Sequence, residues 1–218
     1  MSKRSFKTWR IIFSALYIGL AIFAIVQAVL PGETSAAESR TFTSITTQTI
    51  FGEEVETVKV LNNSLTFKEF TAFLRKVIGH FAYFAAMGIF GFLALFRSVR
   101  TKKVVIIDLL ATFFVAGLTE FLQIFLPTRV GLFSDFVLDG QGAIAAIAIS
   151  CAVIAVRSKL NKGKRRPYLL YYVALPAIVF SILFMIFNAD NLNAYFCFML
   201  YFLICAASLV TIAVATHE

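Results

Sequence analysis

The sequence has little charge, only two histidines and only three cysteines in 218 residues. Charged residues make up 15% of the chain, whereas a soluble domain carries about 25%. Hydrophobic residues make up 60%, and a soluble globule of this length has too small an interior to bury them. The composition therefore excludes secreted, disordered, fibrous and coiled-coil proteins and indicates a polytopic helical membrane protein.

The three cysteines all fall inside long apolar stretches, at Cys151, Cys197 and Cys205. Their number is odd, which does not suit a disulfide framework, and their placement does not suit a zinc knuckle. We therefore interpret them as small apolar packing residues.

Long apolar stretches dominate the rest of the chain. A hydrocarbon core about 30 Å thick is crossed by about 20 helical residues. The stretches that meet this length are Ile11–Leu30, Val77–Phe96, Val104–Leu126, Phe136–Val156, Tyr168–Phe187 and Ala194–Ala215. We predict an all-α fold, a transmembrane bundle of about six spans.

Basic residues lie on one side of these spans. They collect before the first span, between the second and third, and between the fourth and fifth, whereas glutamates collect in residues 31–76. Because cytoplasmic loops are enriched in lysine and arginine, we predict a multi-pass protein of the bacterial cell membrane with both termini in the cytoplasm. The net charge of +8 is then a topology signal, and the basic run 162–166 is a loop near anionic lipid rather than a nucleic-acid site. The first span exceeds a signal-peptide core in length, which favours an uncleaved anchor.

The spans and loops divide the chain into four parts. Residues 1–30 form the cytoplasmic N-terminus and first span, and residues 31–66 an extracytoplasmic segment. In that segment, Thr41–Ile50 and Val55–Leu61 have compositions and alternation typical of strands, so the segment is expected to contain β-structure. Residues 67–156 form a core of three spans, and residues 157–218 a basic cytoplasmic loop with two further spans.

Ionisable residues inside spans are unfavourable and usually face the interior of the bundle. Asp108 lies near the cytoplasmic end beside Lys102 and Lys103, so we interpret it as an interfacial charge. The others lie at similar depth in the outer half of three consecutive spans. Helical spacing aligns them within each span: Lys76, His80 and Tyr83 on the second, Glu120 and Gln123 on the third, and Asp135 and Asp139 on the fourth.

This alignment predicts a polar pocket that faces outward. The connection after the third span carries Arg129 over the pocket, and Arg75 lies at its rim with Lys76 and Tyr83. The alternative is a network of interhelical hydrogen bonds and ion pairs that only stabilises the bundle. The two alternatives stay open at the level of sequence, because either one buries the same residues.

The order and spacing of these polar residues resemble the VanZ-like family of bacterial membrane proteins. The similarity runs through Arg75-Lys76-x3-His80-x2-Tyr83, Thr119-Glu120-x2-Gln123-x5-Arg129 and Asp135-x3-Asp139-x2-Gly142, over about residues 70–155. It departs at Thr119, where the family often has an acidic or small polar residue, and at Asp139, where it commonly has asparagine. The resemblance implies a role in the cell envelope at the outer membrane face, linked to resistance to the lipoglycopeptide teicoplanin.

Three functions fit these observations. In the first, the pocket binds an amphiphile such as a lipid-linked cell-wall precursor or a lipoglycopeptide. Arg75, Lys76 and Arg129 then contact anionic headgroups, and Tyr83, Gln123 and Asp139 complete the binding site.

In the second, an intramembrane hydrolase or transferase acts on a lipid headgroup. His80 is its general base, Glu120 or Asp135 orients His80, and Arg129 stabilises phosphate charge. A version with Mg²⁺, Mn²⁺ or Ca²⁺ uses His80, Glu120, Asp135 and Asp139 as ligands.

A transporter is the third alternative, although no repeat or broken helix supports it. We predict no resident metal or cofactor and expect membrane lipids as partners. The oligomeric state stays open.

Overall fold

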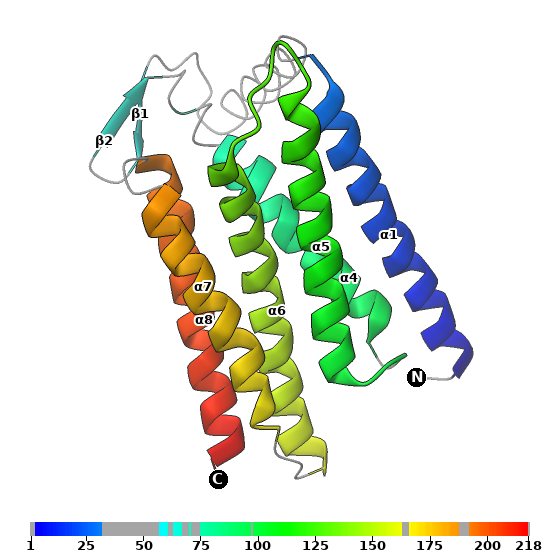
Figure 1. The fold of residues 1–218 in the computed structure, drawn as a ribbon. Helices are drawn as coiled ribbons and strands as arrows, with labels where there is room; N and C mark the ends of the chain where they lie inside the picture. The colour runs from blue at the N-terminus through cyan, green and yellow to red at the C-terminus, as the bar shows by residue number, and fades with distance from the viewer. Residues whose placement is uncertain are drawn as a thin grey trace.

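The computed structural model describes residues 3–31, 57–60, 63–66, 70, 75–96, 98–162, 166–187 and 192–217. Almost all of this part is helical (Figure 1). The helices are α1 (Lys3–Val29), η1 (Arg75–Ala82), α4 (Tyr83–Leu95), α5 (Thr101–Ile124), α6 (Phe133–Lys162), α7 (Tyr168–Phe187) and α8 (Leu192–His217). The helix η1 is a π-helix that runs directly into α4.

Six helical segments are long and apolar enough to cross a membrane. They are Lys7–Val29, Lys76–Leu95, Thr101–Ile124, Phe133–Leu160, Tyr168–Phe187 and Tyr195–Thr216. Large apolar side chains such as Phe114, Leu175 and Leu203 are exposed on their outer faces, as expected where lipid covers a protein. The prediction of a multi-pass helical membrane protein is confirmed.

The helix α6 lies at the centre of the bundle, between α7 and α8 on one side and α4 and α5 on the other (Figure 1). Every residue from 137 to 148 is buried, and small side chains let the neighbouring helices come close. Gly88 of α4 is in tight contact with Ala143 and Ala146 of α6. By contrast, only 11% of the span in α1 is buried, so α1 is a peripheral helix held by specific contacts.

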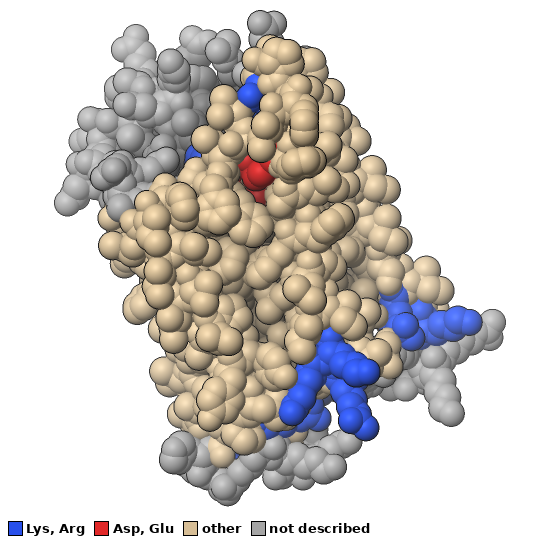
Figure 2. Space-filling model, viewed as in Figure 1, with Lys and Arg blue, Asp and Glu red and all other residues tan. Residues whose placement is uncertain are grey.

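The two ends of the bundle differ in charge. The chain termini lie at the same end (Figure 1), and most of the lysine and arginine on the face drawn in Figure 2 gathers there. We call this the basic end. Arg166 ties its elements together, with 2.9 Å from its Nη1 to the Thr101 hydroxyl and 3.1 Å from its Nε to the Ser158 hydroxyl. The common position of the termini agrees with the predicted topology, while the identity of the two membrane sides stays a prediction.

A short hairpin precedes η1 and lies at the opposite end of the bundle (Figure 1). Strand β1 (Thr57–Val60) pairs antiparallel with β2 (Asn63–Thr66), with Thr57 opposite Thr66 and Val60 opposite Asn63. Strand β1 lies within the segment Val55–Leu61 that we expected to form a strand, whereas its partner β2 was not predicted. The other predicted strand, Thr41–Ile50, lies outside the described residues.

The interpretation of Asp108 as an interfacial charge is wrong. Its exposed fraction is 1%, and neither carboxylate oxygen has a hydrogen-bond partner in the part of the chain that the structure describes. The carboxylate packs directly on Gly91 of α4, beside the Tyr17 ring of α1. From its position in the span we placed Asp108 near the membrane interface. In the structure α1 covers it, and Gly91, which has no side chain, leaves room for its carboxylate. The three cysteines are buried and unpaired, which confirms that they are packing residues.

Candidate functional site

The π-helix η1 places two site residues on its face toward α6. Lys76 and His80 lie in this segment, and both contact carboxylates of α6. A glycine lets the helices meet: a side chain at Gly142 of α6 would overlap the carbonyl oxygen of Phe81. Short π-helical segments are rare and occur frequently at functional sites, so this stretch of the second span is a natural place to look for one.

Four side chains from η1 and α6 pair across this contact. The Nδ1 of His80 is 2.9 Å from Oδ1 of Asp139, and its Nε2 is 3.6 Å from Oδ2 of Asp135. Lys76 forms an ion pair with Asp135. Each helix supplies its two residues at a spacing of four, which puts them on one face of a helix. The predicted convergence of these residues is therefore present in the structure.

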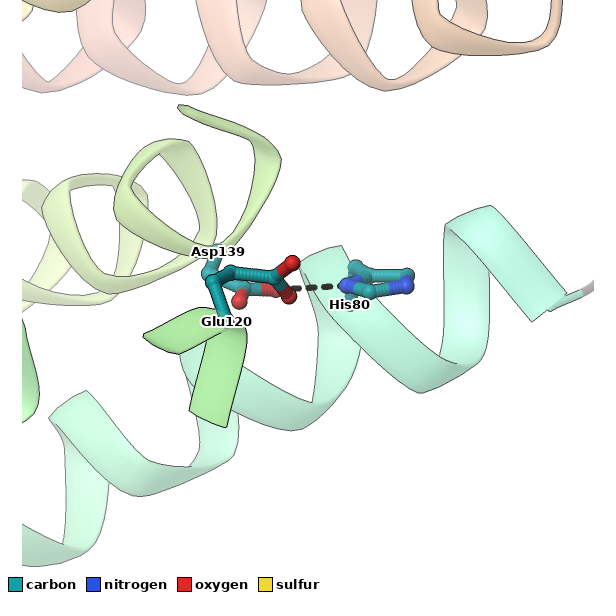
Figure 3. Close-up of side chains that lie close together, drawn as sticks. All are labelled: His80, Glu120 and Asp139. Carbon is teal, nitrogen blue, oxygen red and sulfur yellow. Dashed lines mark hydrogen bonds and ion pairs between the residues drawn. The ribbon is translucent and has the colours of Figure 1, made fainter. Parts of the chain in front are cut away.

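Glu120 joins the same group from α5. Its Oε2 accepts a hydrogen bond of 2.8 Å from the backbone N–H of Leu132, in the connection to α6. Gly131 packs against the backbone carbonyl of Glu120, so a side chain there would collide with it. The connection folds back on the end of α5 and fixes the Glu120 carboxylate. Figure 3 shows this carboxylate beside His80 and Asp139.

We call Lys76, His80, Glu120, Asp135 and Asp139 the His80 cluster. It is deep on one side and open on the other. The exposed fraction is 1% for Asp139 and 8% for Glu120, against 15% for the side chains of His80 and Asp135 and 20% for Lys76. Figure 2 shows acidic atoms in a recess among uncharged side chains, far from the basic end. The cluster is therefore reachable from the surface.

Exposed apolar side chains lie close to cluster residues in the chain. Ile78 of η1, Leu132 and Phe133 are each more than two-fifths exposed. They lie within three residues of cluster residues in the chain, and the backbone N–H of Leu132 donates to Glu120. The arrangement suits a molecule that has both a polar and an apolar part.

Two predicted binding residues make contacts with α1 instead. The Nε of Arg129 donates to the carbonyl of Leu30 at 3.2 Å, and its Nη2 donates to the carbonyl of Gln27 at 3.3 Å. These are carbonyls at the C-terminal end of α1, where basic side chains commonly bind. Tyr83 donates its hydroxyl to the carbonyl of Leu20. In this structure both residues hold α1 against the bundle.

Two further residues were predicted at the site, Gln123 and Arg75. Gln123 is half-buried on α5, one turn beyond Glu120. Arg75 begins η1, and its side chain lies outside the described part. Sequence reasoning also missed the backbone N–H of Leu132 as a partner of Glu120. The glycine at 131 was the available signal, because a close backbone approach requires a residue without a side chain.

Three members of the His80 cluster have the geometry of metal ligands. One ligand atom each from His80, Glu120 and Asp139 lies within 4.8 Å of the other two. Asp135, which sequence reasoning included among the candidate ligands, is instead paired with Lys76. One imidazole nitrogen with two carboxylate oxygens forms a donor set for a divalent cation.

Six spans and an ionisable cluster shared by three consecutive ones define a polytopic membrane protein with a buried polar site. The family model for VanZ/LLP1 matches residues 12–155, more than half of the chain, and the protein belongs to this family. The match extends the resemblance seen at residues 70–155 back through α1. This extent agrees with the structure, since Tyr83 and Arg129 fasten α1 to the core. No curated protein and no solved structure matches the chain.

Proposed function

We propose that this VanZ-family protein binds the polar headgroup of an amphiphilic envelope molecule at the His80 cluster. A lipid-linked cell-wall precursor and a lipoglycopeptide such as teicoplanin are the ligands we consider. The observation that carries the proposal is the cluster itself, a group of ionisable and partly exposed side chains on three consecutive membrane-spanning helices. With both termini cytoplasmic, the cluster faces the outer leaflet.

The charge of the cluster argues against a purely structural network. Three carboxylates, from Glu120, Asp135 and Asp139, face one lysine and one histidine. A buried network that only stabilises a fold needs its charges compensated, because an uncompensated buried charge is strongly destabilising. Among the described residues the carboxylates outnumber the basic groups, and this supports a site that a proton, a cation or a ligand completes.

The same contacts change the expected role of the basic residues. Lys76 is engaged by Asp135, and Arg129 by carbonyls of α1. The proposal therefore assigns headgroup binding to the carboxylates and His80, with Leu132 and Phe133 beside the apolar part of the ligand. The basic residues position the elements that carry these groups.

Acid–base catalysis on the bound headgroup is the second candidate. The observation in its favour is the histidine between two carboxylates. Asp139 holds Nδ1 of His80, while Nε2 lies at the looser distance of 3.6 Å from Asp135. A carboxylate that orients an imidazole so that its other nitrogen can accept a proton is the arrangement of a general base. In this candidate the protein is a hydrolase or transferase.

Photo-crosslinking in intact cells tests the binding proposal. A benzoylphenylalanine in place of Leu132 keeps the backbone N–H that binds Glu120 and puts the reactive group on an exposed residue that contacts the cluster. The matched control carries it in place of Leu175, which is 67% exposed on α7. We expect a defined amphiphile adduct at 132 that Glu120→Gln abolishes, and general phospholipid adducts at 175.

Identical adducts at both positions, unaffected by Glu120→Gln, would refute a specific site. If position 132 captures a defined amphiphile, that molecule is used to test the second candidate, acid–base catalysis. Its mass should change on incubation with purified wild type and stay unchanged with the His80→Ala variant if the protein is an enzyme.

A further inference from the structure

We infer that His80, Glu120 and Asp139 bind a hard divalent cation, Mg²⁺ or Mn²⁺, and that this ion contacts the headgroup. The inference rests on the proposed function for the identity of the contacted molecule, but the ion site stands on its own geometry. The donors come from three helices, η1, α5 and α6, and Figure 3 shows the two carboxylates side by side and directed toward His80.

The distances between donors fit one ion. Three atoms that are at most 4.8 Å apart enclose a point about 2.8 Å or less from each, whereas Mg²⁺ binds oxygen at about 2.0–2.1 Å. Movements of less than an ångström bring all three donors to bonding distance. The Nδ1 of His80 and Oδ1 of Asp139 are already 2.9 Å apart, close to the about 3.0 Å that separates neighbouring ligands of an octahedral ion with such bonds.

Charge balance points to the same conclusion. Glu120 and Asp139 are the most buried carboxylates of the cluster, and Lys76 is committed to Asp135. Two carboxylates that share a buried site repel each other, and a proton or a cation between them relieves the repulsion. A divalent cation neutralises both carboxylates and lets His80 act as a neutral ligand.

Neighbouring groups contact two of the three donors, His80 and Glu120, and orient them for metal binding. A histidine that binds a metal through one nitrogen usually directs its other nitrogen to a carboxylate. The Nε2 of His80 faces Asp135 in this way, at 3.6 Å. The Oε2 of Glu120 is held by the Leu132 N–H, so its other oxygen can bind the ion. The Leu132 contact fixes the Glu120 carboxylate, and Asp135 lies on the side of the His80 ring away from Nδ1.

The ion also explains how an acidic cluster contacts an envelope amphiphile. Three protein ligands leave coordination positions for water or for oxygen atoms of another molecule, and Mg²⁺ commonly bridges carboxylates to phosphate. The cation supplies the positive charge for an anionic headgroup, which Lys76 and Arg129 do not supply in this structure. The chemical class of the contacted group is therefore a phosphate or another anionic oxygen group.

Electron paramagnetic resonance with Mn²⁺ tests the ion site. Chelator-treated, monodisperse protein is titrated with Mn²⁺, and the signal of free Mn²⁺ reports the amount bound. We expect one Mn²⁺ per chain, with a spin-echo modulation from the ¹⁴N nucleus of His80. Glu120→Gln and Asp139→Asn preserve shape and should weaken binding at least about 10-fold. Asp108→Asn, the same change in a buried carboxylate outside the site, should bind as wild type does.

Two results would overturn the inference: no saturable binding to folded wild type, or bound Mn²⁺ without ¹⁴N modulation. The second readout needs no variant, so it survives a variant that fails to fold. The crosslinking experiment tests the proposed function separately from the ion site. A Glu120-dependent adduct at position 132 in protein that binds no Mn²⁺ would overturn the ion site and retain the headgroup site. Bound Mn²⁺ without any such adduct would overturn headgroup binding and retain the ion site.

Discussion

The ion pair between Lys76 and Asp135 gives a quantitative test of how the cluster is held together. Both side chains are mostly buried, with exposed fractions of 20% and 15%. Lys76→Met keeps the apolar stem and removes the charge, which leaves Asp135 beside Asp139 without its lysine. Removing one partner of a buried pair costs about 3–5 kcal/mol. Because the pair is partly exposed, we expect the lower end, a loss of about 3 kcal/mol in the free energy of unfolding.

Equilibrium unfolding in mixed detergent micelles measures this loss. About 3 kcal/mol corresponds to a change of more than 100-fold in the unfolding equilibrium constant. The double variant Lys76→Met/Asp135→Leu removes both charges and should return to within about 1 kcal/mol of wild type. Lys103→Met, at an exposed lysine of the basic end, is the matched control and should change stability by less than about 0.5 kcal/mol. A loss below about 1 kcal/mol for Lys76→Met, or a double variant as unstable as the single one, would refute a buried pair.

Three further predictions follow from contacts outside this pair. Arg129→Met removes the hydrogen bonds to the end of α1. The free energy of unfolding should therefore fall by about 2 kcal/mol, and amide hydrogen exchange should become faster at residues 26–30. Unchanged exchange there would contradict the anchoring role of Arg129. Asp108→Leu replaces a buried carboxylate that has no hydrogen-bond partner among the described residues. The midpoint of thermal unfolding should therefore stay constant or rise. A clear fall would show that the carboxylate has a stabilising partner. Gly142→Ala forces a side chain against η1 and should destabilise by about 1–3 kcal/mol, whereas Gly19→Ala, in open space, should be neutral or slightly stabilising; equal effects would contradict the close contact.

The spans and the site residues were predictable for a simple physical reason. Hydrocarbon tolerates a long apolar helix, so every predicted span overlaps an observed one, and the fifth has the same bounds in both. It penalises ionisable groups, so His80, Glu120 and Asp139 stand out in sequence, and helical spacing aligned the residues of each span. The structure then brings these three together.

Side-chain partners were less predictable, because they depend on how helices pack. Arg129 has a basic side chain next to an acidic site, yet it binds carbonyls at the end of α1, more than ninety positions earlier in the chain. Asp108 lies beside lysines in sequence, yet Gly91 and Tyr17 enclose it. Both outcomes are set by contacts between α1 and the core, and nothing in the local sequence pattern fixes the position of a peripheral helix.

The π-helical start of the second span was also missed. A π-helix and an α-helix have the same apolar composition, so hydropathy does not distinguish them. The difference matters at Lys76 and His80, since the backbone geometry of η1 sets how these side chains meet α6. Proximity of Phe81 to Gly142 shows that tertiary packing stabilises this segment.

The central claim is that the His80 cluster is a ligand site and more than a stabilising network. Native mass spectrometry and detergent unfolding of the same samples test it most directly, with wild type beside Glu120→Gln, Asp139→Asn and the control Asp108→Asn. We predict that wild type and Asp108→Asn retain an amphiphile and that both cluster variants lose it, while Glu120→Gln, which keeps an oxygen acceptor for the Leu132 N–H, has an unfolding midpoint close to wild type. Loss of the retained mass only in step with loss of stability would contradict the claim and identify the cluster as structural.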